Sequence, residues 1–233
     1  MPRNIISNKT PINFVINKKT YNVQKLDIPQ DQTCGKNNFY VSKQYFIKEA
    51  SLNNPQVCGT ALNTVKFYTE YYKPGIYQVP KLLDYQIGNS KVKLLFENIG
   101  SGTLASYLKS HHMNSEEARA TLKKVLEAIV PFEENDVKHG DIKLKNIIMK
   151  DDKAYIIDFD LLGHKQNYMK QLTAMIFDFE HAHRTKEISH SQQVTFSKDL
   201  SIYHSCCRDV VDAILKNEVS SVKEVLGLIS DNT

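Results

Sequence analysis

The sequence predicts an α+β protein with two lobes, a strand-rich N-terminal lobe and a shortened helical C-terminal lobe. Short clusters of β-branched and aromatic residues, separated by polar turns, fill most of the first hundred residues. After Gly100 the apolar residues recur at helical spacing instead. Strands and helices thus come as successive blocks, which is typical of α+β proteins. We expect one domain over residues 1–233, with an N-lobe over about 12–97 and a C-lobe over 98–233.

The first block contains short strands and one helix. A stripe of apolar positions that begins after Thr60 and reaches Tyr72 predicts the helix, and Pro74-Gly75 ends it. Gly88-Asn89 separates two strand-like runs and predicts a tight hairpin. The expected strands cover residues 14–16, 20–26, 39–41, 45–47, 81–87 and 92–96.

The second block is mostly helical. Asn114 with Glu117 three residues later predicts a capping box at the start of a helix, and Ser221 with Glu224 predicts another. A small hairpin over 147–157, turning at Asp151-Asp152, interrupts the helices. Further helical spacing begins near residue 169.

Composition indicates a globular intracellular protein. Of 233 residues, 41% are hydrophobic and 24% charged, and the net charge is only +4. This charge does not favour nucleic-acid binding. The apolar runs are too short to span a bilayer, and the polar start lacks the apolar stretch of a secretory signal. We expect a cytoplasmic protein, with a host cytoplasm or nucleus as variants of this, that binds no membrane and no nucleic acid.

The chemistry concentrates in two short segments, which read HGDIKLKN over 139–146 and IDFD over 157–160. Phosphoryl transfer requires positioning and charge neutralisation more than covalent chemistry. Asp141, Asn146 and Asp158 offer the oxygen ligands that Mg²⁺ prefers, and Lys143 adds a cation for the transferred phosphate. The pattern indicates a phosphotransferase.

These segments resemble the catalytic loop and the metal-binding motif of protein kinases, His-Arg-Asp-x-Lys-x-x-Asn followed by Asp-Phe-Gly. The resemblance implies a bilobal protein-kinase-like fold that uses ATP and Mg²⁺. It makes Asp141 the catalytic base, Lys143 the phosphate-stabilising lysine, and Asn146 and Asp158 the metal ligands. Gly140 replaces the usual arginine, as in vaccinia-related, RIO-type and aminoglycoside-type kinases.

The resemblance extends upstream to the ATP-binding residues. Lys48 in Tyr-Phe-Ile-Lys is similar to the lysine that grips the α- and β-phosphates. Its implied partner is Glu70, the only glutamate between Glu49 and Glu97. The segment 94–100 is similar to the strand and hinge that hold adenine, which implies backbone contacts from Glu97 and Ile99.

Three departures from the family pattern stand out. No G-x-G-x-x-G precedes Lys48, and Gly35 is the only candidate for a phosphate-covering turn. Asp160 stands where the glycine of Asp-Phe-Gly is expected. There is no Ala-Pro-Glu motif after it, so control by phosphorylation of an activation segment is not expected.

The interpretation that follows is a minimal Ser/Thr protein kinase, which transfers the γ-phosphate of ATP to a protein hydroxyl. Its protein substrate is not identified by the sequence, and a regulatory protein partner is an open possibility. One alternative is a catalytically weak kinase mimic that binds and modulates a host kinase or another protein. Another is a small-molecule kinase, which Asp160 favours and Lys143 disfavours.

Overall fold

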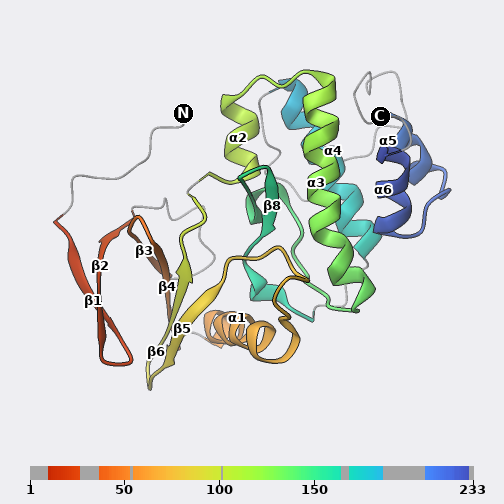
Figure 1. The fold of residues 1–233 in the computed structure, drawn as a ribbon. Helices are drawn as coiled ribbons and strands as arrows, with labels where there is room; N and C mark the ends of the chain where they lie inside the picture. Colours follow the sequence, from red (N-terminus) through yellow and green to blue (C-terminus); the bar gives the residue numbers. More distant parts are fainter. Residues whose placement is uncertain are drawn as a thin grey trace.

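The computed structural model describes residues 10–26, 37–52, 55–100, 102–163, 168–185 and 208–230. A curled antiparallel sheet forms the N-terminal part, and helices with one small hairpin form the rest (Figure 1). The predicted fold class is confirmed. The extent of the single domain stays a prediction. The prediction for Gly35 falls outside the described residues.

The sheet has the strand order β1-β2-β3-β4-β6-β5, with every neighbouring pair antiparallel. Asn17 and Lys18 turn the β1–β2 hairpin with left-handed φ angles of 47° and 67°, as a tight hairpin of this hand requires. The predicted hairpin at Gly88 is confirmed. The strands are β1 (Ile12–Ile16), β2 (Lys19–Lys25), β3 (Asn38–Val41), β4 (Tyr45–Ser51), β5 (Leu82–Ile87) and β6 (Lys91–Glu97).

The sheet curls until its first and last strands touch. The Asn17 side-chain nitrogen donates to Asp84 Oδ1 over 2.7 Å and to the Tyr85 carbonyl over 3.0 Å. Lys93 Nζ donates to the Val15 carbonyl over 2.9 Å. The curl encloses a small apolar cluster of Phe14, Ile16, Val23, Tyr40, Ile47 and Leu95.

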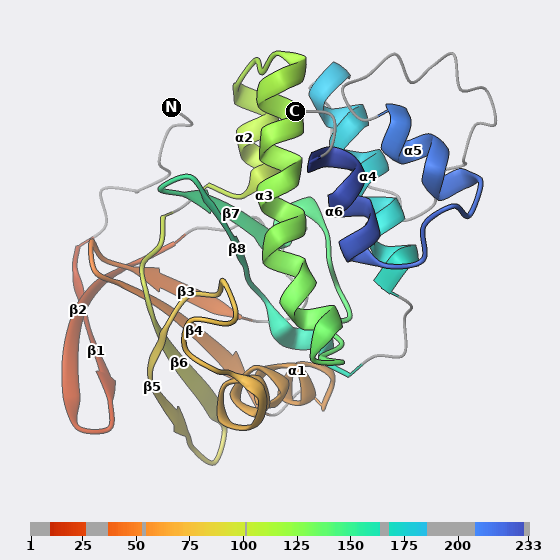
Figure 2. The same cartoon turned by 45° about the vertical axis from the view of Figure 1, so that its right-hand side comes forward.

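Helix α1 (Pro55–Lys66) continues into one π-helical turn, η2 (Phe67–Tyr71). The predicted start at Thr60 is wrong, because the helix already begins at Pro55. Proline suits a first helical turn, since its fixed φ is helical and its missing N–H would have no partner there. The helix lies between the sheet and the turn that follows strand β8 (Lys153–Ile156) (Figures 1 and 2). It packs on the sheet through Ala50, Ala61, Val65, Val92, Leu94 and Phe96.

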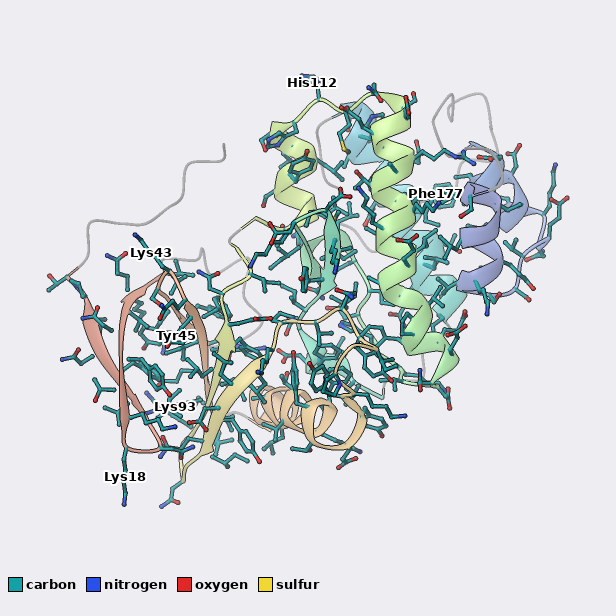
Figure 3. All side chains as sticks on the ribbon, viewed as in Figure 1. Lys18, Lys43, Tyr45, Lys93, His112 and Phe177 are labelled. Carbon is teal, nitrogen blue, oxygen red and sulfur yellow. The ribbon has the colours of Figure 1, made fainter. Side chains whose placement is uncertain are left out.

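The helical part is organised around the long helix α3, with the β7–β8 hairpin beside it (Figure 2). Phe177, labelled in Figure 3, belongs to its core. None of the described helices is long and apolar enough to cross a membrane. The elements are α2 (Leu104–Ser110), α3 (Ser115–Glu134), β7 (Ile147–Lys150), β8 (Lys153–Ile156), α4 (Tyr168–Thr185), α5 (Arg208–Leu215) and α6 (Val222–Ser230).

The capping box predicted at the start of α3 is confirmed. Asn114 Oδ1 accepts the Glu117 N–H over 2.8 Å, and Glu117 Oε2 accepts the Asn114 N–H over 2.9 Å. At the start of α6, Ser221 Oγ accepts the Glu224 N–H over 3.2 Å. The Glu224 carboxylate, however, accepts the N–H of Ser220 and not that of Ser221. The second predicted box is therefore closed one residue earlier in the chain.

Candidate active site

An ion cluster joins the sheet to the turn after β8. Lys48, on β4, places its Nζ 2.9 Å from Asp158 Oδ1 and 2.7 Å from both carboxylate oxygens of Asp160. Only 9% of the Lys48 side chain is exposed, against 39% for Asp158 and 16% for Asp160. The structure thus brings together Lys48 and Asp158, which the sequence assigned to one site although they lie 110 positions apart.

The charges in this cluster support one another. Burial alone lowers the pKa of Lys48, but the adjacent carboxylates of Asp158 and Asp160 overcome this and raise it. Burial also opposes the charge of Asp158, yet the Lys48 ammonium holds its pKa below the usual range. The pKa of Asp160 is raised, chiefly by burial. Lys48 is therefore a cation and Asp158 an anion at neutral pH.

Asp158 is held in an uncommon backbone conformation. Its φ of 69° and ψ of 74° lie in the left-handed region, which costs a residue other than glycine roughly 1–3 kcal/mol and is concentrated at functional sites. The next residue, Phe159, opens a 3₁₀ turn, η4 (Phe159–Leu161), and is buried. Its ring lies against Phe67 at a centroid distance of 3.8 Å and against His139 at 4.8 Å. This column of rings fixes the turn that carries Asp158 between α1 and the catalytic loop.

The segment 139–146 forms a compact loop around Asp141. Lys143 Nζ is 2.6 Å from Asp141 Oδ2, and the Asn146 side-chain nitrogen donates over 2.9 Å to both Oδ2 and the backbone carbonyl of Asp141. Asn146 ends the 3₁₀ turn η3 (Leu144–Asn146) and is buried. Because its nitrogen is used by Asp141, its amide oxygen remains for a cation. The structure brings together Asp141, Lys143 and Asn146 as the sequence predicted.

His139 and Ile157 connect this loop to the ion cluster. His139 Nε2 lies 3.2 Å from the Ile157 carbonyl, and Nδ1 accepts the Asp141 N–H over 3.3 Å. Ile157, next to Asp158, donates its own N–H to the Asn146 carbonyl over 2.9 Å. Burial lowers the pKa of His139, so its ring is neutral and meets both partners with one donor and one acceptor. Asp141 and Asp158 are therefore positioned by one shared network.

Gly140 has a steric reason to stand where the family motif has arginine. Its φ is +84°, and a Cβ built on it would lie 2.0 Å from the Leu161 carbonyl oxygen. No side chain fits at that distance without a shift of the backbone around η4. The close approach of these two backbones requires the glycine.

Two residues of α4 that the sequence did not reveal support the loop around Asp141 through hydrogen bonds to its backbone. Gln171 Oε1 accepts the Ile142 N–H over 3.0 Å, and Gln171 is buried. The Tyr168 hydroxyl donates to the Val137 carbonyl and accepts the His139 N–H. Burial raises the pKa of Tyr168 well above its ordinary value, so the hydroxyl keeps its proton. Neither residue lies in a motif that the sequence analysis used.

The predicted pair of Lys48 with Glu70 is wrong. The Glu70 side chain is 55% exposed and lies 3.9 Å from the ammonium of Lys66. The π-helical turn around Glu70 directs Phe67 into the core instead. About one turn before Phe67, Asn63 and Thr64 contact Asp160.

The predicted adenine-binding segment ends β6. The Glu97 N–H donates to the Lys81 carbonyl over 3.0 Å, and Glu97 Oε1 accepts the Lys81 N–H over 2.9 Å. Ile99 is buried, and so is Phe96, whose ring packs near Phe46 and Tyr68. The contacts of Glu97 and Ile99 with adenine stay a prediction.

The site suits a magnesium–nucleotide better than a metal held by protein alone. Among the described residues, no three His, Cys, Asp or Glu side chains form a metal cage. Mg²⁺ commonly takes one or two carboxylates and completes its shell with waters and substrate phosphates. The carboxylate of Asp158 and the amide oxygen of Asn146 are donors of that kind, so the residues fit the ion.

The chain matches the family described as protein kinase domain over residues 35–201, more than half of its length. The chain belongs to the protein kinase family. It is also 32% identical over 98 residues to Protein kinase kin1 of Schizosaccharomyces pombe. That match covers 40% of this kinase-family chain but only 11% of kin1.

Two solved structures share the fold. Monomeric WbdD superposes with a TM-score of 0.67 at 16% identity, over 94% of this chain and 51% of that one. Rad53 1–466 in complex with AMP-PNP superposes with a TM-score of 0.60 at 16% identity, over 88% of this chain and 64% of that one. At such identities the likeness shows the kinase fold alone.

Proposed function

We propose that this protein is an ATP-dependent Ser/Thr protein kinase, which transfers the γ-phosphate of ATP to a hydroxyl group of a protein in the cytoplasm. The observation that carries the proposal is the direct contact of Lys48 with Asp158, within the network that also fixes Asp141. Membership of the protein kinase family supports it. The AMP-PNP bound to Rad53 supports ATP as the nucleotide.

Each residue of the network has a task in this reaction. Asp141, fixed by Asn146, accepts the proton of the attacking hydroxyl. Lys143, which rests on Asp141, can turn to the oxygens of the transferred phosphate. Lys48 offers its ammonium to the α- and β-phosphates. Mg²⁺, when bound through Asn146 and Asp158, would neutralise phosphate charge.

The test is transfer of labelled phosphate from Mg-ATP to the protein itself and to a general protein substrate. The Asp141→Asn variant keeps the size of the side chain but removes the base, so we expect transfer to fall by roughly 10²–10⁴-fold. Asp152→Asn, an exposed change on the β7–β8 turn, is the matched control and should label like the wild type. Equal labelling by Asp141→Asn and wild type would reject the proposal. Labelling of a sugar or choline panel without labelling of protein would instead indicate a small-molecule kinase.

A second candidate is a kinase mimic that binds nucleotide and modulates another protein but transfers phosphate poorly. The observation in its favour is that two carboxylates already hold Lys48, so a nucleotide must compete for its ammonium. A thermal shift with ATP distinguishes the candidates. Stabilisation by ATP in a wild type that labels neither itself nor any substrate would favour the mimic.

A further inference from the structure

We propose that Asp160 is the residue that positions Lys48 for the nucleotide, in the role that the sequence assigned to Glu70. This inference rests on the proposed function, since the positioned lysine is the one that meets the phosphates. It also changes the role of α1. The helix does not supply the carboxylate itself but holds the carboxylate that follows Phe159.

The geometry makes Asp160 the stronger of the two partners of Lys48. Both of its oxygens lie 2.7 Å from Nζ, whereas Asp158 contributes one oxygen at 2.9 Å. The Asp160 side chain is also the less exposed, at 16% against 39%. Charge-assisted contacts of this length in a buried site are strong and directional.

Asp160 is itself held in place by α1. Its backbone carbonyl accepts the Asn63 side-chain nitrogen over 3.0 Å, and its Oδ1 lies 3.4 Å from Thr64 Oγ1. Thr64 is buried, with 3% of its surface exposed. The buried Thr64 hydroxyl and the Asn63 side-chain amide therefore fix Asp160 in the absence of nucleotide.

The number of contacts allows the two carboxylates to have separate roles. Lys48 Nζ meets three carboxylate oxygens, one of Asp158 and two of Asp160. Asp158 can therefore turn to another cation while Asp160 keeps its two contacts with Lys48. If Asp158 were the sole partner of Lys48, the ammonium would be unpaired once Asp158 bound another cation.

The first arm of the test does not depend on catalysis. In the nucleotide-free protein, the rate at which Lys48 is acylated by a small amine-directed reagent is followed by peptide mass spectrometry. A buried, ion-paired ammonium reacts slowly, so Asp160→Asn should raise the rate by about tenfold. Asp160→Glu, which keeps the charge, should restore most of the protection, and Asp152→Asn should leave the rate unchanged. Equal rates in wild type and Asp160→Asn, or a rise in Glu70→Gln instead, would overturn the proposal.

The second arm measures the reaction. Asp160→Asn should lower kcat/KM for ATP by about tenfold or more, because Lys48 is no longer pre-organised. The Mg²⁺ concentration that gives half-maximal rate should stay within about twofold of the wild type, because Asp160 acts on Lys48 and not on the ion. A large rise in that concentration with kcat/KM preserved at saturating Mg²⁺ would make Asp160 a metal ligand and overturn the positioning role.

The two arms separate this inference from the proposed function. If the wild type transfers no phosphate while Asp160→Asn still exposes Lys48 to acylation, the kinase proposal fails and the pairing of Asp160 with Lys48 stands. If transfer is robust and Lys48 is equally protected in both proteins, the positioning role of Asp160 fails and the kinase proposal stands.

Discussion

The ring of Phe159 lies flat on the ring of Phe67, with centroids 3.8 Å apart and an angle of 6° between the planes. Both rings are fully buried, and Phe159 directly follows Asp158. The π-helical turn η2, which continues α1, therefore packs directly against the turn that follows Asp158. A change in that contact should therefore alter both the stability of the fold and the position of Asp158.

Replacing Phe67 with Ala should lower the free energy of unfolding by about 3–5 kcal/mol, because it removes a fully buried ring and leaves a cavity beside Phe159. Phe67→Leu should cost less, since it refills part of that volume. Urea denaturation followed by far-UV circular dichroism measures both variants. A cost below about 1 kcal/mol for Phe67→Ala would contradict the stacked arrangement.

Gly140→Ala should be far more damaging than Gly163→Ala, although both glycines have nearly the same positive φ. The values are +84° and +82°, but the added Cβ meets the Leu161 carbonyl oxygen at 2.0 Å only at Gly140, and nothing within 4 Å at Gly163. Gly163→Ala should therefore lower the free energy of unfolding by about 1–2 kcal/mol, because a residue with a Cβ is disfavoured in the left-handed conformation. Gly140→Ala should lose clearly more and also reduce phosphate transfer. Similar unfolding midpoints for the two variants would show that the clash is relieved without cost.

Gln171→Met should weaken catalysis from a distance. The substitution removes the acceptor of the Ile142 N–H, and an unpaired buried donor costs about 1–3 kcal/mol. We expect kcat to fall while KM for ATP changes little, because Lys48 and its partners lie on other elements. Thr173→Val, on the same helix, is the control, since among the described residues its hydroxyl bonds only to the Met169 carbonyl. A drop in kcat shared by both variants would point to a general effect on α4.

His139 should make the fold sensitive to mild acid. Burial lowers the pKa of His139 below its ordinary 6.5, so the unfolded chain takes up a proton before the folded protein does. The free energy of unfolding therefore decreases as the pH falls below about 6.5, by at most about 1.4 kcal/mol for each pH unit. Melting temperatures measured from pH 7.5 to 5.5 test this. His139→Gln should be less stable at pH 7.5 but lose less on acidification; an equal loss would show that other groups control the acid response.

The parts of the site that were predictable are those that follow one another in the chain. The spacing from Asp141 to Asn146 lies within one loop, so local geometry brings its members together whatever the rest of the fold does. The pairing of Lys48 with Asp158 followed only from the family resemblance. Strand alternation and the capping box at Asn114 were likewise local signals.

The site residues that were predicted wrongly or missed are those whose contacts depend on packing between elements far apart in the sequence. Glu70 was chosen because it was the only nearby glutamate, but the π-helical turn gives the buried position to Phe67. Asp160 was noted as an unusual residue, and nothing in the sequence showed that its carboxylate reaches Lys48. Gln171 holds Ile142 across 29 positions, a contact that no spacing rule contains.

The contacts between Asn17 and β5 also affect how copies of this protein meet one another. Outer strands of open sheets present unpaired N–H and C=O groups, onto which a strand of a second molecule can add. Here the Tyr85 carbonyl is occupied by Asn17 and the Val15 carbonyl by Lys93. A strand from a second molecule would have to displace the side chains of Asn17 and Lys93 where β1 meets β5. Within the part of the chain that the structure describes, the curl of the sheet thus withholds these two carbonyls from a strand of a second molecule.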